Sequence, residues 1–527
     1  MTKPYDVVCI GAGSNTLVLA AYMAKAGKSV LLLEKNDQAG GGVISVEIAP
    51  GFTHDPHATG YISFQANPAI KDDELGLFSR FGLETFTYEA SFASIFESGE
   101  GLVTYTDIDR SCEGIAKYSQ KDADSYRAFV AKAKQILPIL GRGSSTPPLP
   151  TGRFFSLLEQ SEIGRELQSA MFKSAYDVIE SLFETVEVKL HYLKWCAEVM
   201  ENPETNGTGI VMYQLCGLAH TYEALGITGG SKNLTNALVR CIERYGGEIR
   251  LNSEVAKVDI ESGNATGVTL ATGEHIAASD AIVGCIHPWH LGDVVPGVDP
   301  NIAARARQTK LSGHGALNQQ IALTELPEFR AGSEYRDAMC VEYVPLDLDG
   351  VRKTFDQYRF GEIPKRCISP MTMVHSLKDP SRAPEGQCAM YLYHFAPLEL
   401  KEGGIEAWSQ QRETFADAIW EAFASFTTNM DQDKIIARLI ETPLEHHRHS
   451  NSMVNGDIIG LGTTIGQLMG QRPIPELANY RIPGLEKLYL AGPFMHPGGT
   501  VLFGGRATAI KMCQDMDIDL HKVFEFI

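Results

Sequence analysis

The sequence predicts an α/β protein with a parallel sheet at its N-terminus and a helical region inserted after it. Three observations support this class. Residues 6–10 form a β-branched run that ends at a glycine-rich turn, residues 17–26 have the Ala- and Leu-rich composition of a helix, and residues 29–33 form a second apolar strand. Strand, helix and strand in this order make a βαβ unit.

The rest of the chain alternates between helical and strand-like patterns. Leu, Phe and Tyr recur at helical spacing from about residue 72 to 222, and a Gly/Pro/Ser-rich loop is predicted at 141–150. Strands are predicted at residues 248–258, 267–270 and 281–285, a β-rich and helical stretch at 311–442, a last strand at 487–492 and a helix near 506–512. From the length of the chain we expect two domains.

Composition excludes some classes of protein. The chain has 527 residues, with 46 Lys and Arg against 65 Asp and Glu, a formal charge of −19, which argues against a nucleic-acid binder. The ten cysteines form no CxxC pair and are expected to be reduced core residues. We find no signal-peptide pattern and no apolar run of bilayer-spanning length, so we expect a cytoplasmic protein.

The turn after the first strand has the spacing of a dinucleotide-binding fingerprint. Gly11 would permit the tight turn, and Gly13 would let the backbone approach a pyrophosphate at the helix N-terminus. Glu34, at the end of the second strand, is positioned to accept hydrogen bonds from a ribose. Thr16 stands at the third glycine position, which weakens the match without breaking it. A glycine-rich turn without a ligand is the alternative.

Two further glycine-rich segments favour FAD over NAD. Residues 40–42 are three consecutive glycines soon after Glu34, where a second phosphate contact would be needed. Residues 492–506 form a glycine-rich loop that opens the last helix, and such a helix N-terminus could stabilise negative charge on a reduced flavin. A simple C-terminal turn is the alternative for that loop.

Several motifs in a fixed order carry a family resemblance. They are residues 6–34, the glycine doublet, residues 50–52, Gly229-Gly230, residues 379–386, Arg472-Pro473, and residues 488–492 with 496–499. Together they resemble the bacterial-type phytoene desaturase (carotenoid oxidoreductase) family, and more closely its branch related to the pyridine nucleotide-disulphide oxidoreductase domain-containing proteins of mitochondria. The resemblance spans nearly the whole chain. It implies an amine-oxidase-type FAD-binding Rossmann domain assembled from three separated segments, which we expect at residues 1–71, 223–300 and 446–527. The inserted α+β substrate domain is then expected to comprise a helical cap, residues 72–222, and a second part, residues 301–445.

The resemblance also assigns the cofactor contacts. It implies that the pyrophosphate is held by Gly11, Gly13, Ser14 and Asn15, the adenosine ribose by Glu34 with Lys35 beside it, and the phosphates also by Gly41 and Gly42. It further implies that the backbone of the strand containing Val255 meets the adenine, and that Gly492 and the backbone of Thr500, Val501 and Leu502 reach the ribityl chain and the flavin ring. Met495 precedes the His-Pro-Gly-Gly run where the family usually has Thr, and Leu502-Phe503 is a second departure. Both departures would line the ring pocket.

Two histidines are candidates for proton transfer. His496, in the loop predicted to flank the flavin, could accept a proton; the favoured alternative is that it braces the loop by hydrogen bonding. His57 would approach the ring from the other side, with a turn histidine paired with Asp55 as its alternative. The histidines of residues 446–449 and 287–290 lack a completing Cys or carboxylate cluster, so we expect no metal. Since the C-terminal glycine-rich loop has no cysteine, we expect noncovalent FAD.

The leading hypothesis is an FAD-dependent oxidoreductase, a dehydrogenase or desaturase, that takes hydride from a hydrophobic, isoprenoid or alicyclic substrate and passes electrons to oxygen or a quinone. Apolar residues of the helical insertion would line a substrate channel or simply form core: Leu182, Phe183, Leu190, Tyr192, Leu193, Trp195, Met200, Met212 and Tyr213. The alternatives are a flavin isomerase without net redox and a lipid-binding non-enzyme of the same fold; an amine oxidase has only the fold in its favour. Peripheral membrane contact stays open and would need a local apolar patch.

Overall fold

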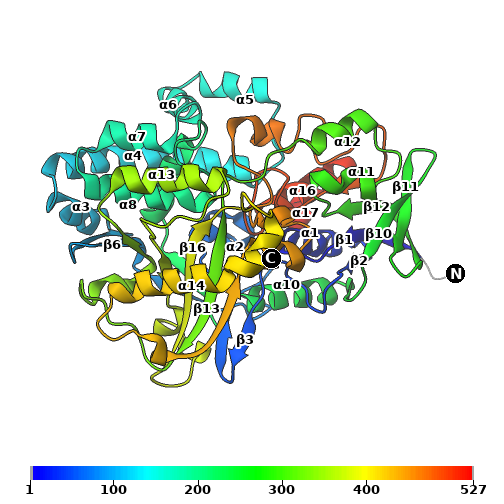
Figure 1. The fold of residues 1–527 in the computed structure, drawn as a ribbon. Helices are drawn as coiled ribbons and strands as arrows, with labels where there is room; N and C mark the ends of the chain where they lie inside the picture. The colour runs from blue at the N-terminus through cyan, green and yellow to red at the C-terminus, as the bar shows by residue number, and fades with distance from the viewer. Residues whose placement is uncertain (1–3, 525–527) are drawn as a thin grey trace.

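The computed structural model describes residues 4–524, and its first sheet combines strands from both ends of the chain (Figure 1). Strands β9, β2, β1, β12 and β18 are parallel neighbours in that order, and the antiparallel hairpin β10–β11 extends from the first half of β12. Their bounds are β1 (Tyr5–Ile10), β2 (Val30–Leu33), β9 (Glu248–Arg250), β10 (Val255–Glu261), β11 (Asn264–Leu270), β12 (His275–Gly284) and β18 (Leu488–Leu490). The predicted βαβ unit and the predicted strands at 248–258, 267–270, 281–285 and 487–492 all belong to this sheet.

Apolar residues on both faces of the sheet are buried, as the continuous apolar runs predict. Val7 and Cys9 of β1 face a core shared with α1, α10 and α16, whereas Val8 faces a core shared with α11 and α12. Helix α1 packs against both α10 and α16. The bounds are α1 (Ser14–Lys25), α10 (Lys232–Arg244), α11 (Leu291–Val294), α12 (Pro300–Ala306), α16 (Phe503–Asp515) and α17 (Leu520–Phe524).

A second, mixed sheet has the order β17-β13-β16-β15-β14-β6-β7. One face packs against the helical lobe and the other against α14 (Trp408–Ser425). The strands are β6 (Ala90–Phe96), β7 (Gly101–Tyr105), β13 (Gly315–Leu323), β14 (Ala338–Val344), β15 (Met371–Met373), β16 (Cys388–Ala396) and β17 (Ile435–Glu441). Residues 90–105 were expected to be helical, and that expectation was wrong. All seven residues of β6, which lies between β14 and β7, are buried, so β6 has no solvent-facing side that would give it an alternating polar and apolar pattern.

The helical lobe lies above this sheet in Figure 1 and comes mainly from residues 108–219. It comprises α3 (Ile108–Ala116), α4 (Gln120–Ser144), α5 (Thr151–Leu158), α6 (Glu162–Met171), α7 (Ala175–Leu182), α8 (Val186–Cys196) and α9 (Gly209–Ala219), with α13 (Leu348–Arg359) beside them. A loop was predicted to begin at residue 141, but α4 continues to Ser144 and the loop begins at residue 145. Because His496 and Arg506 hydrogen-bond to the terminal carbonyls of Gly143 and Ser145, tertiary contacts satisfy the last turn of α4 despite its glycines.

Short elements join the two sheets. Strands β3 (Val46–Ala49) and β4 (Phe52–His54) form a hairpin, β5 (Thr85–Tyr88) pairs with β8 (Ala224–Ile227), and α2 (Pro68–Lys71) and α15 (Pro443–His449) lie in the connections. All ten cysteines are free, and eight are buried. Among residues 4–524, no helix is both long and apolar enough to cross a bilayer.

Candidate functional site

One cavity of about 650 Å³ extends from the edge of the first sheet into the space between the helical lobe and the second sheet. Its walls contain almost every residue that the sequence predicted as a cofactor contact. Those residues are Gly11, Gly13, Ser14, Asn15, Glu34, Lys35, Gly41, Gly42, Val255, Gly492, Thr500 and Val501. Segments separated by almost 490 positions in the chain therefore meet around a single space.

The glycine turn between β1 and α1 brings two backbones unusually close. Gly11 has φ +84°, and Gly13 is the N-cap of α1. A Cβ on Gly41, whose φ is +61°, would lie 3.1 Å from the Cα of Gly13. The side chain of Thr16 is fully buried, and its hydroxyl donates to the Gly13 carbonyl at 3.1 Å, so the threonine is accommodated at the third glycine position. The first residues of α1 line the cavity, and the N-terminus of a helix favours a bound anion.

Glu34 is held in place by backbone groups. The N–H of Ala12 donates to Glu34 Oε2 at 2.8 Å, and the N–H of Asn36 donates to Oε1 at 3.0 Å. The side chain is 7% exposed and lines the cavity. Nearby, Lys35 Nζ donates to Asn451 Oδ1 at 2.9 Å. These bonds fix the carboxylate at the end of β2, the position from which a ribose hydroxyl can be bound.

Asn15 joins the N-terminal turn to the C-terminal loop. Its amide Nδ2 donates to the Thr500 carbonyl at 3.1 Å, and the N–H of Gly505 donates to its Oδ1 at 3.0 Å. Leu502 is placed differently from the other predicted contacts. It has φ +72° as the N-cap of α16, and its side chain is buried in the core instead of lining the cavity.

His496 lines the cavity but also braces the fold. Its Nε2 lies 2.8 Å from the Gly143 carbonyl at the end of α4, and burial lowers the pKa of the ring to about 4. Imidazole is therefore neutral at physiological pH, and one of its two nitrogens is engaged by backbone. This geometry agrees with the bracing interpretation.

His57 lies among other histidines. Its ring centroid is 4.8 Å from that of His449 and 5.4 Å from that of His446, and burial together with these neighbours lowers its pKa well below 6.5. Within the described part of the chain neither ring nitrogen has a hydrogen-bond partner. His57 therefore does not pair with Asp55. Ligand atoms of His57, Glu441 and His446 lie within 4.8 Å of one another, a group that could hold a metal ion, so the expected absence of a metal stays a prediction.

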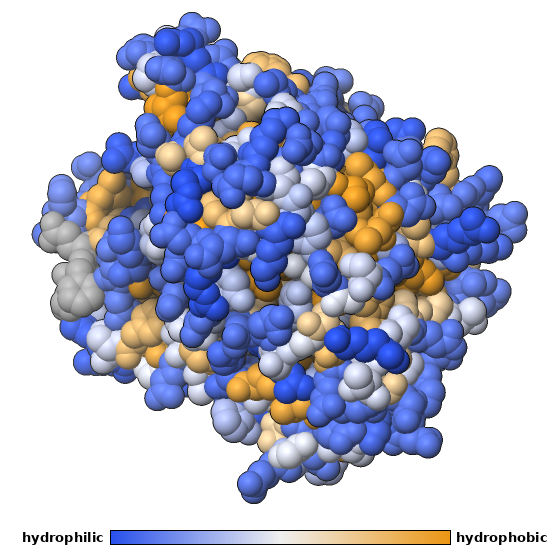
Figure 2. All heavy atoms as spheres, turned by 90° about the vertical axis from the view of Figure 1, so that its left-hand side faces the viewer, coloured by the Kyte–Doolittle hydropathy of each residue, from blue (hydrophilic) through white to orange (hydrophobic). Residues whose placement is uncertain are grey.

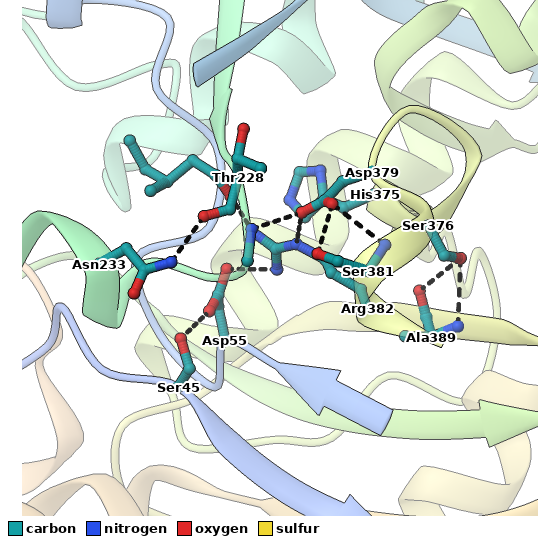
Figure 3. Close-up of polar contacts among 12 residues, drawn as sticks. Ser45, Asp55, Thr228, Asn233, His375, Ser376, Asp379, Ser381, Arg382 and Ala389 are labelled. Atoms are coloured by element: carbon teal, nitrogen blue, oxygen red, sulfur yellow. Dashed lines mark hydrogen bonds and ion pairs between the residues drawn. The ribbon is translucent and has the colours of Figure 1, made fainter. Parts of the chain in front are cut away.

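Asp55 instead belongs to a buried ion-pair network with Arg382 and Asp379 (Figure 3). Arg382 donates to Asp55 at 2.7 Å, to Asp379 at 3.1 Å and to the Ile227 carbonyl at 2.7 Å. Asp379 also accepts the N–H of Gly229 at 2.7 Å. The network fastens three motifs that are distant in sequence, and it holds the segment that carries His57.

The inner half of the cavity is mostly apolar. Its lining includes Leu140, Phe154, Met171, Trp195, Met200, Val211, Leu215, Met339, Met371, Met373, Tyr391 and Met469. Of the channel candidates expected from sequence, Trp195 and Met200 line the cavity, whereas residues such as Leu190, Tyr192 and Met212 are core.

Sequence reasoning missed Glu198, which lies in this apolar half. It belongs to a 3₁₀ turn, Ala197–Val199, after α8, and its carboxylate hydrogen-bonds to the Tyr393 hydroxyl. Burial and the nearby Glu342 raise its pKa. A single glutamate in the run 195–200 offers no periodic or motif signal, so the sequence alone could not have singled it out.

Comparison with known families decides what kind of protein has this site. The family model for flavin containing amine oxidoreductase matches residues 17–325. The chain belongs to this family. It is therefore a flavin-dependent oxidoreductase, and the fold class predicted from the sequence is confirmed.

The relatives of this flavin oxidoreductase match it over nearly its full length. It is 26% identical to pyridine nucleotide-disulfide oxidoreductase domain-containing protein 2 of Mus musculus, over 98% of this chain and 94% of the relative. It is 25% identical to a limonene dehydrogenase polypeptide of Castellaniella defragrans (98% and 96%) and 24% identical to phytoene desaturase (lycopene-forming) of Pseudescherichia vulneris (97% and 99%). The resemblance inferred from the motifs is confirmed.

Solved structures agree on the fold. An oxidoreductase from Methanosarcina mazei superposes with a TM-score of 0.61 at 14% identity, covering 97% of this chain and 99% of its own. Cyclohexylamine oxidase from Brevibacterium oxydans gives 0.57 at 16% identity, covering 98% and 100%.

The residues on the cavity wall fit FAD, the cofactor of this family. A Cβ on Gly41 would crowd the Gly13 backbone, α1 presents its N-terminus beside these two glycines where a pyrophosphate could approach, and the carboxylate of Glu34 is held where a ribose hydroxyl could be bound. When bound, FAD supplies a ring nitrogen that accepts hydride. The chain must then supply substrate binding, orientation and proton handling.

Proposed function

We propose that the protein is an FAD-dependent dehydrogenase or desaturase that takes hydride from a C–H bond of a hydrophobic substrate and introduces a C=C or C=O bond. The observation that carries this proposal is the continuity of the cavity. The same space is lined at one end by the glycine turn and Glu34 and at the other by methionines, aromatic residues and leucines. An apolar molecule held there would lie against the flavin without crossing solvent.

The lining favours substrates of isoprenoid or alicyclic type. Methionine side chains adapt to irregular apolar shapes, and Met200, Met339, Met371 and Met373 all face this space. Two of the relatives are named for limonene dehydrogenation and phytoene desaturation, both reactions of terpenoid hydrocarbons. Oxygen or a quinone would serve as the electron acceptor.

Within this proposal the two histidines have different roles. His496 holds the C-terminal loop against α4 through the Gly143 carbonyl. His57 lines the cavity with both nitrogens unpaired among residues 4–524, so a ring nitrogen is free to accept a proton. The lowered pKa of the ring makes it a weak base, so His57 would pass the proton on and not retain it. We therefore assign proton acceptance to His57 and bracing to His496.

An apolar patch suited to peripheral membrane contact lies beside the cavity. Phe154 of α5 lines the cavity, while Leu157 is 47% exposed and Phe172, stacked on Phe155, is 56% exposed. Figure 2, which views the helical-lobe side, shows hydrophobic residues only in small patches within a hydrophilic surface. Contact with a membrane would accordingly be local, as expected for a protein with this net charge.

The visible spectrum of the purified protein and its response to substrates test the function. Oxidised flavin should absorb near 450 nm, and anaerobic addition of limonene, a carotenoid precursor or a cyclic alcohol should bleach that band because hydride reaches the flavin. Cyclohexylamine is the control for amine oxidation. If the protein takes up FAD but isomerises a substrate only after the flavin has been chemically reduced, it is an isomerase and not a dehydrogenase. If only cyclohexylamine bleached the flavin band, the protein would be an amine oxidase and the proposal would be wrong.

A further inference from the structure

A cluster of charged side chains is buried in the wall of the apolar half of the cavity. Lys194 Nζ lies 3.4 Å from Glu342 Oε2, and both side chains are 3% exposed or less. Ser369 donates to the same Glu342 oxygen at 3.4 Å, and the Tyr393 hydroxyl donates to Glu198 Oε2. The Lys194 ammonium also lies 4.3 Å above the Phe395 ring. Of these groups, Glu198 and Tyr393 line the cavity.

The two carboxyl groups of this cluster adjoin each other. Glu198 Oε1 is buried and accepts no hydrogen bond from an N–H or O–H donor among residues 4–524, whereas a proton shared between Glu198 and Glu342 would satisfy it. Lys194 and Glu342 are paired with each other, so the group that the cluster presents to a molecule in the cavity is the hydrogen-bonded pair of Glu198 and Tyr393, both of which line it.

The charge of the cluster selects what can bind there. Lys194 supplies one positive charge against two carboxyl groups, so neutrality is reached when the two carboxyls share one proton. Burial raises the pKa of both Glu198 and Glu342, which agrees with such sharing. A second cation would have to be desolvated in an apolar space where Lys194 already provides the counter-charge. A neutral oxygen group needs no such compensation, and a carboxyl can accept from a hydroxyl or, when protonated, donate to a carbonyl.

We propose that Glu198 anchors an oxygen-bearing substrate, namely an otherwise apolar molecule that carries one hydroxyl or carbonyl group. This inference rests on the proposed function, because it treats the apolar half of the cavity as the substrate site. It narrows that function from hydrocarbons in general to terpenoid or alicyclic alcohols and ketones. Glu198 would thereby fix which carbon of the substrate lies against the flavin.

Binding to the FAD-loaded protein tests the anchor. Limonene and perillyl alcohol share a carbon skeleton and differ by one hydroxyl, and cyclohexane, cyclohexanol and cyclohexylamine form a second matched set. Because a hydrogen bond to a charged or proton-sharing carboxyl contributes about 1.5–3 kcal/mol, the alcohol should bind about 10- to 100-fold more tightly than its hydrocarbon. Perturbation of the flavin spectrum and the shift in Tm give two independent measures of Kd.

Two substitutions then locate the effect. Glu198→Leu should remove most of the preference for the alcohol, and Glu198→Gln, which keeps the size and a hydrogen-bonding group, should retain part of it. Glu201→Gln is the control, since Glu201 is also a buried glutamate nearby but does not line the cavity. Comparing each variant's Tm and flavin content with the wild type separates loss of the anchor from loss of the fold.

Several outcomes would overturn the inference. They are equal affinity of the wild type for alcohol and hydrocarbon, an unchanged preference in a folded Glu198→Leu variant, or tightest binding of the amine. These results would leave the dehydrogenase proposal intact as long as some compound bleaches the flavin. Conversely, alcohol binding that depends on Glu198 without any bleaching would support the anchor and remove the proposed redox function.

Discussion

Glu34 is the single side chain on which FAD affinity should depend most directly. Its carboxylate is already oriented by the N–H groups of Ala12 and Asn36, so no reorganisation is needed when a ribose binds. Glu34→Gln should weaken FAD binding about 10- to 100-fold, because a hydrogen bond to a charged acceptor is replaced by one to a neutral amide. Fluorescence titration of the apoprotein with FAD measures the change.

A matched control is available for that substitution. Glu47 is another glutamate that accepts a backbone N–H, from Gly51 at 2.7 Å, but it is exposed and does not line the cavity. Glu47→Gln should leave FAD affinity unchanged. Equal FAD affinities in Glu34→Gln and the wild type would mean that the ribose is held elsewhere.

At this scale the sequence predicted residues that recur in motifs and missed those that do not. The glycines at fixed spacing and the acid at the end of β2 can be recognised in the sequence because each function requires one residue type. A close approach of backbone to a phosphate requires glycine, and binding of a ribose hydroxyl requires a carboxylate. The family resemblance implied that the backbone of Leu502 reaches the flavin together with Thr500 and Val501, but Leu502 does not line the cavity: it has a positive φ at the start of α16, and its side chain lies in the core. Glu198 was missed because its importance depends on Lys194, Glu342 and Tyr393, which only the fold brings together.

Among elements, the connection between the two sheets depends on Arg382. Its guanidinium joins Asp55 after β4, Asp379, and the carbonyl of Ile227 at the end of β8 (Figure 3). Arg382→Met should lower the free energy of unfolding by about 3–5 kcal/mol, because it leaves two buried carboxylates without their cation. Urea denaturation followed by tryptophan fluorescence measures this loss.

Arg110 provides the comparison for Arg382. It pairs with Glu89 at 3.0 Å, but both side chains are well exposed, so Arg110→Met should cost less than about 1 kcal/mol. If the two substitutions destabilised the protein equally, the buried network would not be what joins these elements.

Helices and strands were predicted correctly where a local pattern, such as an apolar run bounded by glycines, determines the structure. The βαβ unit and the last strand are short apolar runs bounded by glycines, and they fold as expected. Strand β6 and the end of α4 differ because their partners are remote: β6 is paired with β14, about 250 residues later, and α4 is completed by His496 and Arg506. The predicted domain boundaries are a proposal at this same scale, and limited proteolysis would address them.

Over the whole molecule, buried histidines should govern stability in acid. Burial lowers the pKa of His54, His220, His287, His446 and His496 to about 4, whereas a histidine in the unfolded chain titrates near pH 6.5. Between these values the unfolded state binds more protons than the native state, so the free energy of unfolding must fall as pH decreases from about 6.5 towards 4. Glu201 and Glu441 act in the opposite direction, because burial raises their pKa to about 7 and the native state holds their protons.

The histidines outnumber these glutamates, so their contribution should dominate below pH 6.5. The urea midpoint, measured at steps between pH 7 and 4.5, should therefore decrease steadily as the solution is made more acidic. His220→Gln cannot titrate and should show a shallower decrease. A midpoint that stayed level or rose over this range would mean that water or cofactor reaches these histidines and restores their ordinary pKa in the native state.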